Sequence, residues 1–467
     1  MAAMWVFGWL ALPALPCPRT FRIAHACAPP LAQVFSPEPP RHGLALHRTL
    51  AAPTPRHRRH HPIAMTSALL LENIHDTAVE RFKEAQVTVE RRTGALAGDE
   101  LHRAPEGHQI LGIRSATHLG AAEIEAARHL IAIGCFCIGT SQVDLDAAAR
   151  AGMPVFNAPF SNTRSVAELV IAEAILLLRR VPEKNTLAHA GKWAKGATGS
   201  FEARGKTIAI IGYGNIGSQV GVLAEAMGMR VVYYDVQARL SLGSARAARS
   251  LADAVSHADI VTLHVPATAQ TRKMIDAEVL GQFRRGAILI NASRGTVVDI
   301  DALRAACDAN HIAGLAIDVF PEEPKTNADR FTSPLQGVPN AILTPHIGGS
   351  TEEAQENIGT EVATKLIAFL RTGDTVGAVN FPEVSPGPLT SPARLLNVHG
   401  NAPGALAALN TLLARDGVNI VAQHLQTSGQ MGYVVTDLDK VPSPELIAAL
   451  DAEPAFIRCR TLLNPQA

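Results

Sequence analysis

Short apolar runs alternate with amphipathic stretches along the chain from Met65 onward. Apolar runs that end in polar residues predict buried parallel strands, and apolar positions spaced one helical turn apart predict helices between them. The expected strands are 68–71, 109–114, 130–137, 207–211, 230–234, 258–264, 287–291, 314–319 and 341–344, and the expected helices are 75–85, 119–128, 166–180 and 215–227. This alternation favours an α/β fold with doubly wound parallel sheets, in which ligands bind at the carboxyl ends of the strands.

The helix expected at 166–180 is long and apolar, and its start has the sequence of a capping box. Glu168 follows Ser165 by three residues, the spacing at which the two side chains cap the first helical turn. Glu173 and the charges at the end of the run argue against a membrane span. Residues 350–353 are likewise expected to cap a helix.

Beyond residue 392 the pattern predicts a smaller, separate unit. Residues 382–392 are rich in proline and are interpreted as a linker. After them we expect strand, helix, strand, strand, helix and strand at 394–399, 403–415, 418–426, 431–437, 444–451 and 456–463. This βαββαβ order is that of the split βαβ architecture, an α+β ferredoxin-like fold.

Residues 1–64 differ in composition from the rest of the chain. They contain seven arginines, no lysine and a single acidic residue, Glu38. The apolar run 4–16 is interrupted by Pro13 and Pro16 and is too short for a membrane helix. Three interpretations stay open: sequence translated upstream of a natural start at Met65, an organelle transit peptide, or a secretion signal. We favour the first and expect this leader or non-native extension to be disordered.

Composition changes this picture little. The chain has 467 residues, enough for two or three domains, and a formal net charge of +0, which gives no electrostatic case for nucleic acid or an anionic membrane as partner. Its six cysteines lack the spacing of a disulfide framework. Cys135 and Cys137 are interpreted as same-face residues of a buried strand rather than as a metal site, so no metal is expected. A reducing cytoplasm is the default location.

A glycine-rich turn follows the strand expected at 207–211. Gly212 permits the tight turn, Gly214 leaves room for a pyrophosphate, and Gly217 lets the next helix pack closely on the strand. The amino end of that helix presents free N–H groups to phosphates. Asp235 ends the following strand, where a carboxylate accepts both ribose hydroxyls of NAD and repels the 2′-phosphate of NADP. The motif predicts an NAD site, the alternative being an ordinary βαβ turn.

Three charged residues follow three consecutive expected strands. Arg294 is suited to bidentate binding of a carboxylate, and a carboxylate such as Glu323 beside His346 would orient the ring and raise its pKa for proton exchange near neutral pH. Each residue alone has an ordinary structural interpretation, as a surface charge, a loop solubiliser or a helix cap. Together, beside a dinucleotide motif, they predict hydride transfer at a small 2-hydroxy acid.

These stretches resemble the D-isomer-specific 2-hydroxyacid dehydrogenase family. The resemblance covers roughly residues 69–463 and is most specific at 132–140, 156–168, 290–299 and 344–350. Within the family, it points to the branch that carries a carboxyl-terminal ACT domain and oxidises 3-phospho-D-glycerate to 3-phosphohydroxypyruvate with NAD, the first step of L-serine biosynthesis. It implies a homotetramer with L-serine as feedback inhibitor.

The resemblance also implies roles for individual residues. Arg294 would clamp the substrate, His346 would act as acid and base, and Glu323 would be its partner. The residues assigned to NAD are Gly212, Gly214, Asn215, Ile216, Gly217, Asp235, Val265, Ala292, Ser293, Asp318, Gly348 and Gly349. Among them, Asp318 would contact the nicotinamide amide.

The fold that the resemblance implies is split into three domains. They are a substrate-binding domain at 66–161 and 349–385, an NAD-binding Rossmann domain at 162–348 inserted in it, and an ACT domain at 392–467. In the ACT domain, His399, Asn401 and Asn419 match positions that hold L-serine across a domain dimer. The alternative is that they are turn residues that cap the helix at 403.

One departure from the family concerns the substrate's phosphate. Where the resemblance implies a second arginine two residues after Arg114, this chain has Ala116. We expect Arg114, Ser115 and Lys195, with backbone N–H groups, to bind the substrate, and the missing charge-assisted contact to weaken phosphate binding roughly tenfold or more. Rival functions are a dehydrogenase for another 2-hydroxy acid, such as 2-hydroxyglutarate, and a dinucleotide-sensing binding protein of the same fold.

Overall fold

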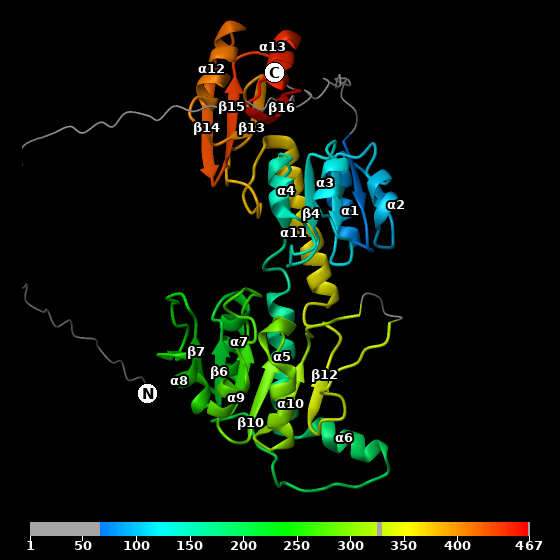
Figure 1. Ribbon diagram of the computed structural model, residues 1–467, viewed down its shortest axis with the longest axis vertical. Helices are drawn as coiled ribbons and strands as arrows, with labels where there is room; N and C mark the ends of the chain where they lie inside the picture. Colours follow the sequence, from blue (N-terminus) through cyan, green and yellow to red (C-terminus); the bar gives the residue numbers. More distant parts are fainter. Residues whose placement is uncertain (1–65, 325–328, 466–467) are drawn as a thin grey trace, which may run out of the picture. The chain divides into compact units, whose positions relative to one another are not determined.

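The computed structural model describes residues 66–324 and 329–465 (Figure 1). Residues 1–64, interpreted above as a leader or non-native extension, lie outside the described residues. The described residues contain two parallel sheets and one antiparallel sheet.

The first sheet has five parallel strands in the order β2-β1-β3-β4-β5. They are β1 (Ser67–Leu70), β2 (Thr88–Arg91), β3 (Ile110–Ile113), β4 (Ala132–Cys135) and β5 (Val155–Asn157). The helices of this region are α1 (Asp76–Glu84), α2 (Gly98–Arg103), α3 (Ala121–Ala126) and α4 (Leu145–Arg150). A later helix, α11 (Glu352–Thr372), returns to this sheet and packs against β4, β5 and α1. Every residue of β3 and β4 is buried, which explains their unbroken apolar sequences.

The second sheet has seven parallel strands in the order β12-β11-β10-β9-β6-β7-β8. They are β6 (Thr207–Ile211), β7 (Arg230–Tyr234), β8 (Arg246–Ala247), β9 (Ile260–Leu263), β10 (Ala287–Asn291), β11 (Ile312–Ile317) and β12 (Ala341–Leu343). Its helices are α5 (Thr163–Leu178), α6 (Val181–His189), α7 (Asn215–Ala226), α8 (Leu251–Ser256), α9 (Ala277–Gln282) and α10 (Ile300–Asp308), with a 3-10 turn at Gly295–Val297. The strand order reverses between β6 and β9, where doubly wound folds bind their ligands.

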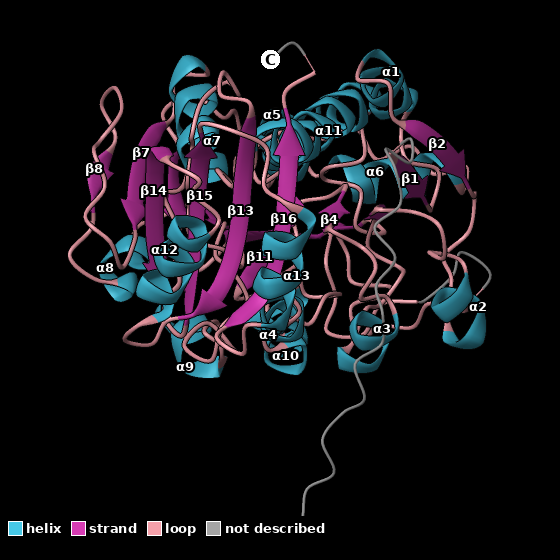
Figure 2. Ribbon diagram, turned by 90° about the horizontal axis from the view of Figure 1, so that it is seen from above, coloured by secondary structure: helices cyan, strands magenta, loops and turns pink. Residues whose placement is uncertain are grey.

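The third sheet is antiparallel, with strand order β14-β15-β13-β16. Its strands are β13 (Ala393–Gly400), β14 (Ile420–Ser428), β15 (Met431–Leu438) and β16 (Phe456–Leu463). Its helices, α12 (Ala405–Arg415) and α13 (Pro444–Ala452), pack on the same face of the sheet (Figure 2). The βαββαβ order and the α/β class expected from the sequence are both confirmed, and element ends differ from the expected ones by a few residues.

The start of α5 corrects the expected capping box. The helix begins at Thr163, its N-cap Asn162 makes no side-chain capping bond, and Ser165 therefore lies inside the first turn. Ser165 Oγ instead pairs with the hydroxyl of Thr351 at 2.8 Å. Thr351, rather than Ser350, caps α11 by accepting the N–H of Ala354. Within the described ranges, no helix is long and apolar enough to cross a membrane.

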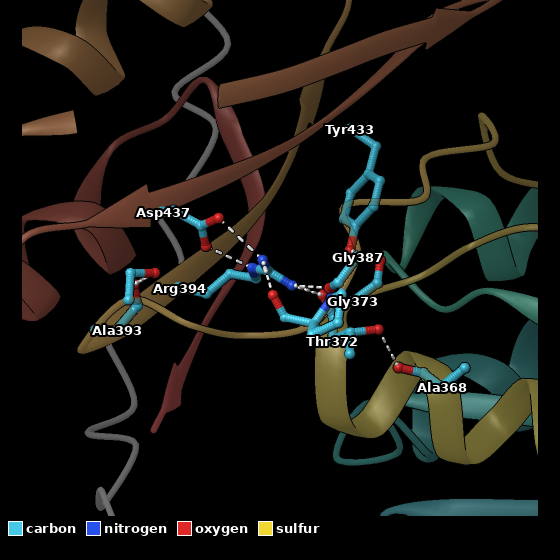
Figure 3. Close-up of polar contacts among 10 residues, drawn as sticks. Ala368, Thr372, Gly373, Gly387, Ala393, Arg394, Tyr433 and Asp437 are labelled. Carbon is cyan, nitrogen blue, oxygen red and sulfur yellow. Dashed lines mark hydrogen bonds and ion pairs between the residues drawn. The ribbon is translucent and has the colours of Figure 1, made fainter. Parts of the chain in front are cut away.

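The proline-rich segment 382–392, interpreted above as a linker, leads into a buried ion pair. Arg394, which follows it, is fully buried (0% exposed) and forms a bidentate ion pair with Asp437, at 2.6 and 2.9 Å (Figure 3). Its guanidinium also donates to the carbonyl oxygens of Gly387 at 2.8 Å and of Thr372 at 3.0 Å. Tyr433 Oη donates to the carbonyl of residue 373 at 2.7 Å. The third sheet is therefore bonded to the end of α11.

Candidate active site

The catalytic candidates lie at the carboxyl ends of three neighbouring strands. β10, β11 and β12 pair side by side in parallel, so their carboxyl ends share one edge of the sheet. Arg294 follows β10, Glu323 follows β11 and His346 follows β12. The structure thus brings to one edge three residues that are far apart in the sequence.

His346 and Glu323 form a hydrogen-bonded pair. His346 Nδ1 lies 2.9 Å from Glu323 Oε2. This hydrogen bond raises the pKa of His346, because the carboxylate favours the charged ring, and partial burial opposes the shift. Burial alone would raise the pKa of Glu323, but hydrogen bonds from His346 and from the N–H of Phe320, with nearby positive charge, hold that pKa below its usual value. The carboxylate is thus ionised and orients an imidazole suited to proton exchange.

The loop that carries His346 is fixed by Asp318. His346 has a left-handed φ of +55°, and its N–H donates to the Asp318 carbonyl at 2.8 Å. The Asp318 side chain is only 2% exposed. Its carboxylate accepts from the Thr344 hydroxyl at 2.6 Å and from the backbone N–H groups of 347 and 348 at 2.8 Å. Its expected contact with nicotinamide stays a prediction.

The turn that carries Arg294 is organised by Asn291, which the sequence analysis did not single out. Asn291 is fully buried at the end of β10. Its Oδ1 accepts from the N–H and the hydroxyl of Ser293 at 3.1 and 2.8 Å, and its Nδ2 donates to the Arg294 carbonyl at 3.1 Å. Asn291 could have been identified from the sequence, because a polar residue at the end of a buried apolar strand needs hydrogen-bond partners.

The Arg294 guanidinium donates to the Ser293 carbonyl at 2.7 Å and acts electrostatically on the catalytic pair. Its positive charge helps to hold the pKa of Glu323 down and offsets part of the rise in the pKa of His346 that Glu323 causes. Gly295 lets the turn approach the loop after β11, because a Cβ there would lie 2.0 Å from the carbonyl carbon of Phe320. A Cβ at Gly139, in the loop after β4, would lie 4.0 Å from Arg294 Nη2. Arg294 is therefore placed between loops of the two parallel sheets.

The glycine-rich turn has the geometry of a dinucleotide loop. Gly212 has φ +92°, and a Cβ there would lie 2.3 Å from the His264 carbonyl oxygen. A Cβ at Gly217 would lie 2.0 Å from the carbonyl oxygen of Gly212. Gly214 has nothing within 4 Å of its Cβ position, and α7 begins at the next residue. The open backbone at the amino end of a helix fits a pyrophosphate group.

Asp235 is anchored to this glycine loop. Its carboxylate accepts the N–H of Tyr213 and the N–H of Gln237, each at 2.9 Å. Arg239 pairs with the same carboxylate at 3.4 Å. The carboxylate that is expected to bind the ribose therefore stands directly beside the loop that is expected to bind the pyrophosphate.

The other residues assigned to NAD lie around the same sheet edge. Those that are buried or half-buried are Ile216, Val265, Ala292, Ser293, Gly348 and Gly349, and Asn215 is exposed. A Cβ at Gly349 would lie 2.0 Å from Asn162 Nδ2, so this loop meets the start of α5. The site thus offers an open glycine loop, a ribose-side carboxylate and an acid–base pair, and it fits NAD, although the individual contacts stay predictions.

The loop expected to hold the substrate's phosphate is organised by Glu72. Its carboxylate accepts the backbone N–H groups of Arg114, Ala116 and Thr117 at 3.1, 2.9 and 2.9 Å. The expectation that backbone N–H groups of this loop bind the substrate is therefore wrong for these three groups, because they already have an acceptor. Sequence reasoning missed Glu72, which lies 42 residues before Arg114.

Arg114 lines an open cavity of ≈ 660 Å³. The other lining residues are His75, Ser350, Thr351, Glu352, Glu353, Gln355 and Glu356. Ser115 and Lys195 are exposed, and Lys195 lies on the segment between α6 and β6.

Cys137 corrects the interpretation of the cysteine pair as same-face strand residues. Cys135 ends β4 and is buried, whereas Cys137 lies beyond the strand, where the chain turns toward Arg294. Cys137 Sγ donates to the Gly139 carbonyl at 3.1 Å and accepts from Gln142 Nε2 at 3.3 Å. Among the described residues, no three His, Cys, Asp or Glu side chains group as a metal site.

The residues expected to bind L-serine lie at two ends of the third sheet. His399, near the end of β13, is 4% exposed, and its Nε2 has no hydrogen-bond partner among the residues that the structure describes. Asn401 follows it and donates to the Gly429 carbonyl at 3.0 Å. Asn419 precedes β14 at the opposite end, where Ile420 pairs with Leu438. The strands between these ends separate His399 from Asn419 by about 20 Å.

Comparisons with known proteins agree with this geometry. Residues 171–348 match the model of the D-isomer specific 2-hydroxyacid dehydrogenase NAD binding domain. The chain is 55% identical over 397 residues to D-3-phosphoglycerate dehydrogenase of Escherichia coli strain K12, covering 84% of this chain and 97% of that protein. It is 50% identical over 395 residues to D-3-phosphoglycerate dehydrogenase of Haemophilus influenzae, with coverage of 84% and 96%.

A solved structure gives the same result for the fold. D-lactate dehydrogenase from Aquifex aeolicus, complexed with NAD and lactic acid, matches with a TM-score of 0.60 and 27% sequence identity, covering 68% of this chain and 100% of that chain. Identity above half to a full-length relative, a matching domain model and a matching fold agree with one another. The chain therefore belongs to the D-isomer specific 2-hydroxyacid dehydrogenase family and is an NAD-dependent dehydrogenase.

Proposed function

We propose that this protein oxidises 3-phospho-D-glycerate to 3-phosphohydroxypyruvate with NAD, the first step of L-serine biosynthesis. The observation that carries the proposal is the His346–Glu323 pair at 2.9 Å beside Arg294, in a chain that is 55% identical to a D-3-phosphoglycerate dehydrogenase. A dinucleotide-sensing protein without turnover would have no use for an ionised carboxylate that orients an imidazole.

Each catalytic residue has one task in this reaction. Arg294 binds the substrate carboxylate with paired N–H groups and so directs the C2 hydroxyl toward His346. His346 takes the hydroxyl proton through Nε2, while Glu323 stabilises the imidazolium that forms. The turn at Gly212 and Gly214 and the Asp235 carboxylate would hold NAD, which would supply the acceptor for the C2 hydride. Asn291 and Asp318 hold the two turns in place, so little ordering is left to the moment of reaction.

The substrate's phosphate is assigned to the side of Arg114. The three glutamates of the adjoining cavity and the Glu72 carboxylate oppose a dianion there, and the absence of a second arginine adds to this effect. We therefore expect a weaker affinity for 3-phospho-D-glycerate than a two-arginine site would give. Ser115 and Lys195 are exposed and are proposed as auxiliary donors. Activity on 2-hydroxyglutarate is the second candidate, because it needs no phosphate contact.

We also propose that L-serine binds between two copies of the third sheet. His399 and Asn419 lie at opposite ends of that sheet in one chain, so a single copy cannot bring them to one amino acid. A second copy in antiparallel orientation would. The unpartnered Nε2 of His399 supports a ligand at this point.

A homotetramer is the oligomer that we propose. The exposed apolar side chains include Val421 and Leu425 on the edge strand β14, and Trp193 and Phe201 before β6. Two distinct self-complementary contacts are what a tetramer with dihedral symmetry requires. A cytoplasmic location accords with such a biosynthetic role.

The His346→Ala variant tests the catalytic assignment. We expect turnover to fall by at least about a hundredfold, since a positioned acid–base group contributes that much, while NADH affinity changes little. His257→Ala, an exposed histidine at the end of α8, is the matched control and should match wild type. If the His346 variant keeps its turnover, another residue carries the proton.

A further inference from the structure

Asp235 holds its negative charge in a small site made of three donors. The N–H groups of Tyr213 and Gln237 reach one carboxylate oxygen each, at 2.9 Å, and Arg239 lies 3.4 Å from Oδ2. The Asp235 side chain is 9% exposed, whereas that of Arg239 is 40% exposed. The two backbone N–H groups and the guanidinium surround one carboxylate. Such a set of donors can bind anions in general, and in this structure it binds the Asp235 carboxylate.

Arg239 is held beside this site by the backbone. The hydroxyl of Tyr233 donates to the Arg239 carbonyl at 2.9 Å and shares a hydrogen bond of 2.9 Å with the Ser241 hydroxyl. Tyr233 is 3% exposed and stacks on Tyr213, with ring centroids 3.9 Å apart. The loop after β7 is therefore pinned to the glycine turn, and the Arg239 guanidinium lies close to the end of β7.

The half-exposed guanidinium has donors to spare. Only Nε of Arg239 is engaged with Asp235, and its two terminal nitrogens make no hydrogen bond with the described residues. A 2′-phosphate on the adenosine ribose would bring its charge to this point, because Asp235 is assigned to the ribose hydroxyls. An arginine near that position is the usual means by which such folds accept the 2′-phosphate of NADP.

We propose that Arg239 determines the cofactor specificity in part, because its charge offsets the repulsion between Asp235 and a 2′-phosphorylated adenylate. Together with the N–H groups of Tyr213 and Gln237, Arg239 forms a latent 2′-phosphate site. The inference rests on the assignment of Asp235 to the ribose. In wild type the carboxylate occupies the donors, so NAD is preferred. The preference for NAD over NADP is nonetheless smaller than it would be if the Asp235 carboxylate had no arginine beside it.

Calorimetric binding of 2′,5′-ADP, compared with 5′-ADP, tests the proposal without turnover. In Arg239→Ala we expect the Kd for 2′,5′-ADP to rise about threefold to tenfold, the range for a charge-assisted contact at a partly exposed side chain, and the Kd for 5′-ADP to change less than about twofold. Arg239→Lys should keep most of the wild-type affinity. Arg285→Ala, an exposed arginine before β10, is the matched control.

Removal of the carboxylate tests the latent site directly. Asp235→Ser should lower the Kd for 2′,5′-ADP roughly tenfold and raise that for NADH, and the double variant with Arg239→Ala should lose the gain. Asp235→Asn, which keeps an oxygen for the backbone N–H groups, serves if the serine variant folds poorly. If Asp235→Ser gains the same affinity for 2′,5′-ADP with and without Arg239, the proposal is overturned, while the assignment of Asp235 to the ribose stays intact. If the Asp235 variants bind NADH as wild type does, the ribose assignment itself fails.

Discussion

The acid–base pair depends on one hydrogen bond. Glu323 raises the pKa of His346, so the ring stays charged to a higher pH than a free histidine would. In Glu323→Gln this support is lost and the pKa of His346 falls. Reduction of the 2-keto acid, which needs the charged ring, should therefore decline at a lower pH than in wild type. Reduction rates measured from pH 5.5 to 9 check this, and an unchanged profile would remove Glu323 from the mechanism.

Glu173 is a buried acid on α5. It is 2% exposed, and neither carboxyl oxygen has a hydrogen-bond partner among residues 66–324 and 329–465. Burial, reinforced by the charge of Asp318, raises its pKa to about 8. The group is therefore protonated at neutral pH, because a charged carboxylate would stand unpaired in an apolar core.

The titration of Glu173 predicts a pH-dependent stability. Its folded pKa of about 8 exceeds its ordinary value of 4.5, so the folded state binds the extra proton between these limits. The protonation of Glu173 therefore adds to the free energy of unfolding. This added stability is full below the pKa of Glu173 in the unfolded chain and is lost as the pH rises toward the folded pKa. Between the two pKa values the free energy of unfolding falls by at most about 1.4 kcal/mol per pH unit. Melting temperatures of Glu173→Gln should thus fall less than those of wild type from pH 5.5 to 8.5. Glu168→Gln, exposed on the same helix, is the control, and identical slopes for all three proteins would refute the shift.

At the scale of elements, the apolar runs of the sequence predicted several strands correctly. β6, β7, β10 and β16 have the bounds expected from the sequence. For β6 and β10 the reason is burial, because strands buried along their length must be apolar, whereas β16 contains two arginines and has a single buried residue. The expected elements did not include the short strands β5 and β8, of which β5 is fully buried, or the helices α2, α4, α8, α9 and α10. They also did not include β2, an edge strand without a buried residue, or α6, whose residues are all half-buried or exposed. Neither element has the periodicity that burial imposes.

The candidate site shows the same division. Residues placed by strand ends or by the glycine turn were found, since topology alone brings them to one edge. Asn291, Glu72 and Gln142 were missed, because their side chains bond to the backbone of turns, and such pairings leave no periodic signal. The polar partners that hold a site are therefore harder to predict than the groups that act in it.

The loop after β3 provides a test of the phosphate assignment. Arg114→Ala should raise the KM for 3-phospho-D-glycerate by at least about tenfold, because a dianion loses its main partner, with little effect on 2-hydroxyglutarate. Ala116→Arg should lower the KM for the phosphorylated substrate only. Steady-state kinetics on both substrates separate these outcomes. Equal losses on the two substrates in Arg114→Ala would make Arg114 a structural residue.

For the whole molecule, the third sheet and the first share one apolar core. The cluster that includes Phe156 and Leu366 around the first sheet continues into Leu396 and Tyr433 of the third. Arg394 adds a buried ion pair and bonds to the end of α11, the helix that begins beside the His346 loop. One helix, α11, thus connects the third sheet with the loop that carries His346.

An L-serine site shared between copies makes a specific prediction for mixed oligomers. His399→Ala and Asn419→Ala should each remove serine binding, since every site needs both residues. In a hybrid of the two variants, one of the two shared sites has both native residues and the other has both alanines. Hybrids should therefore bind about half as much serine per chain as wild type does. Calorimetry on reassociated hybrids measures this. Hybrids that bind no serine, although wild type does, would contradict a site formed between copies.

In the proposed function, the chain oxidises 3-phospho-D-glycerate with NAD. The most direct measurement is NADH formation by the purified protein, followed by absorbance, with 3-phospho-D-glycerate and with 2-hydroxyglutarate at matched concentrations. We predict a higher kcat/KM for 3-phospho-D-glycerate and loss of both activities in His346→Ala. NADH formation from 2-hydroxyglutarate alone, or from neither substrate, would contradict the proposed function.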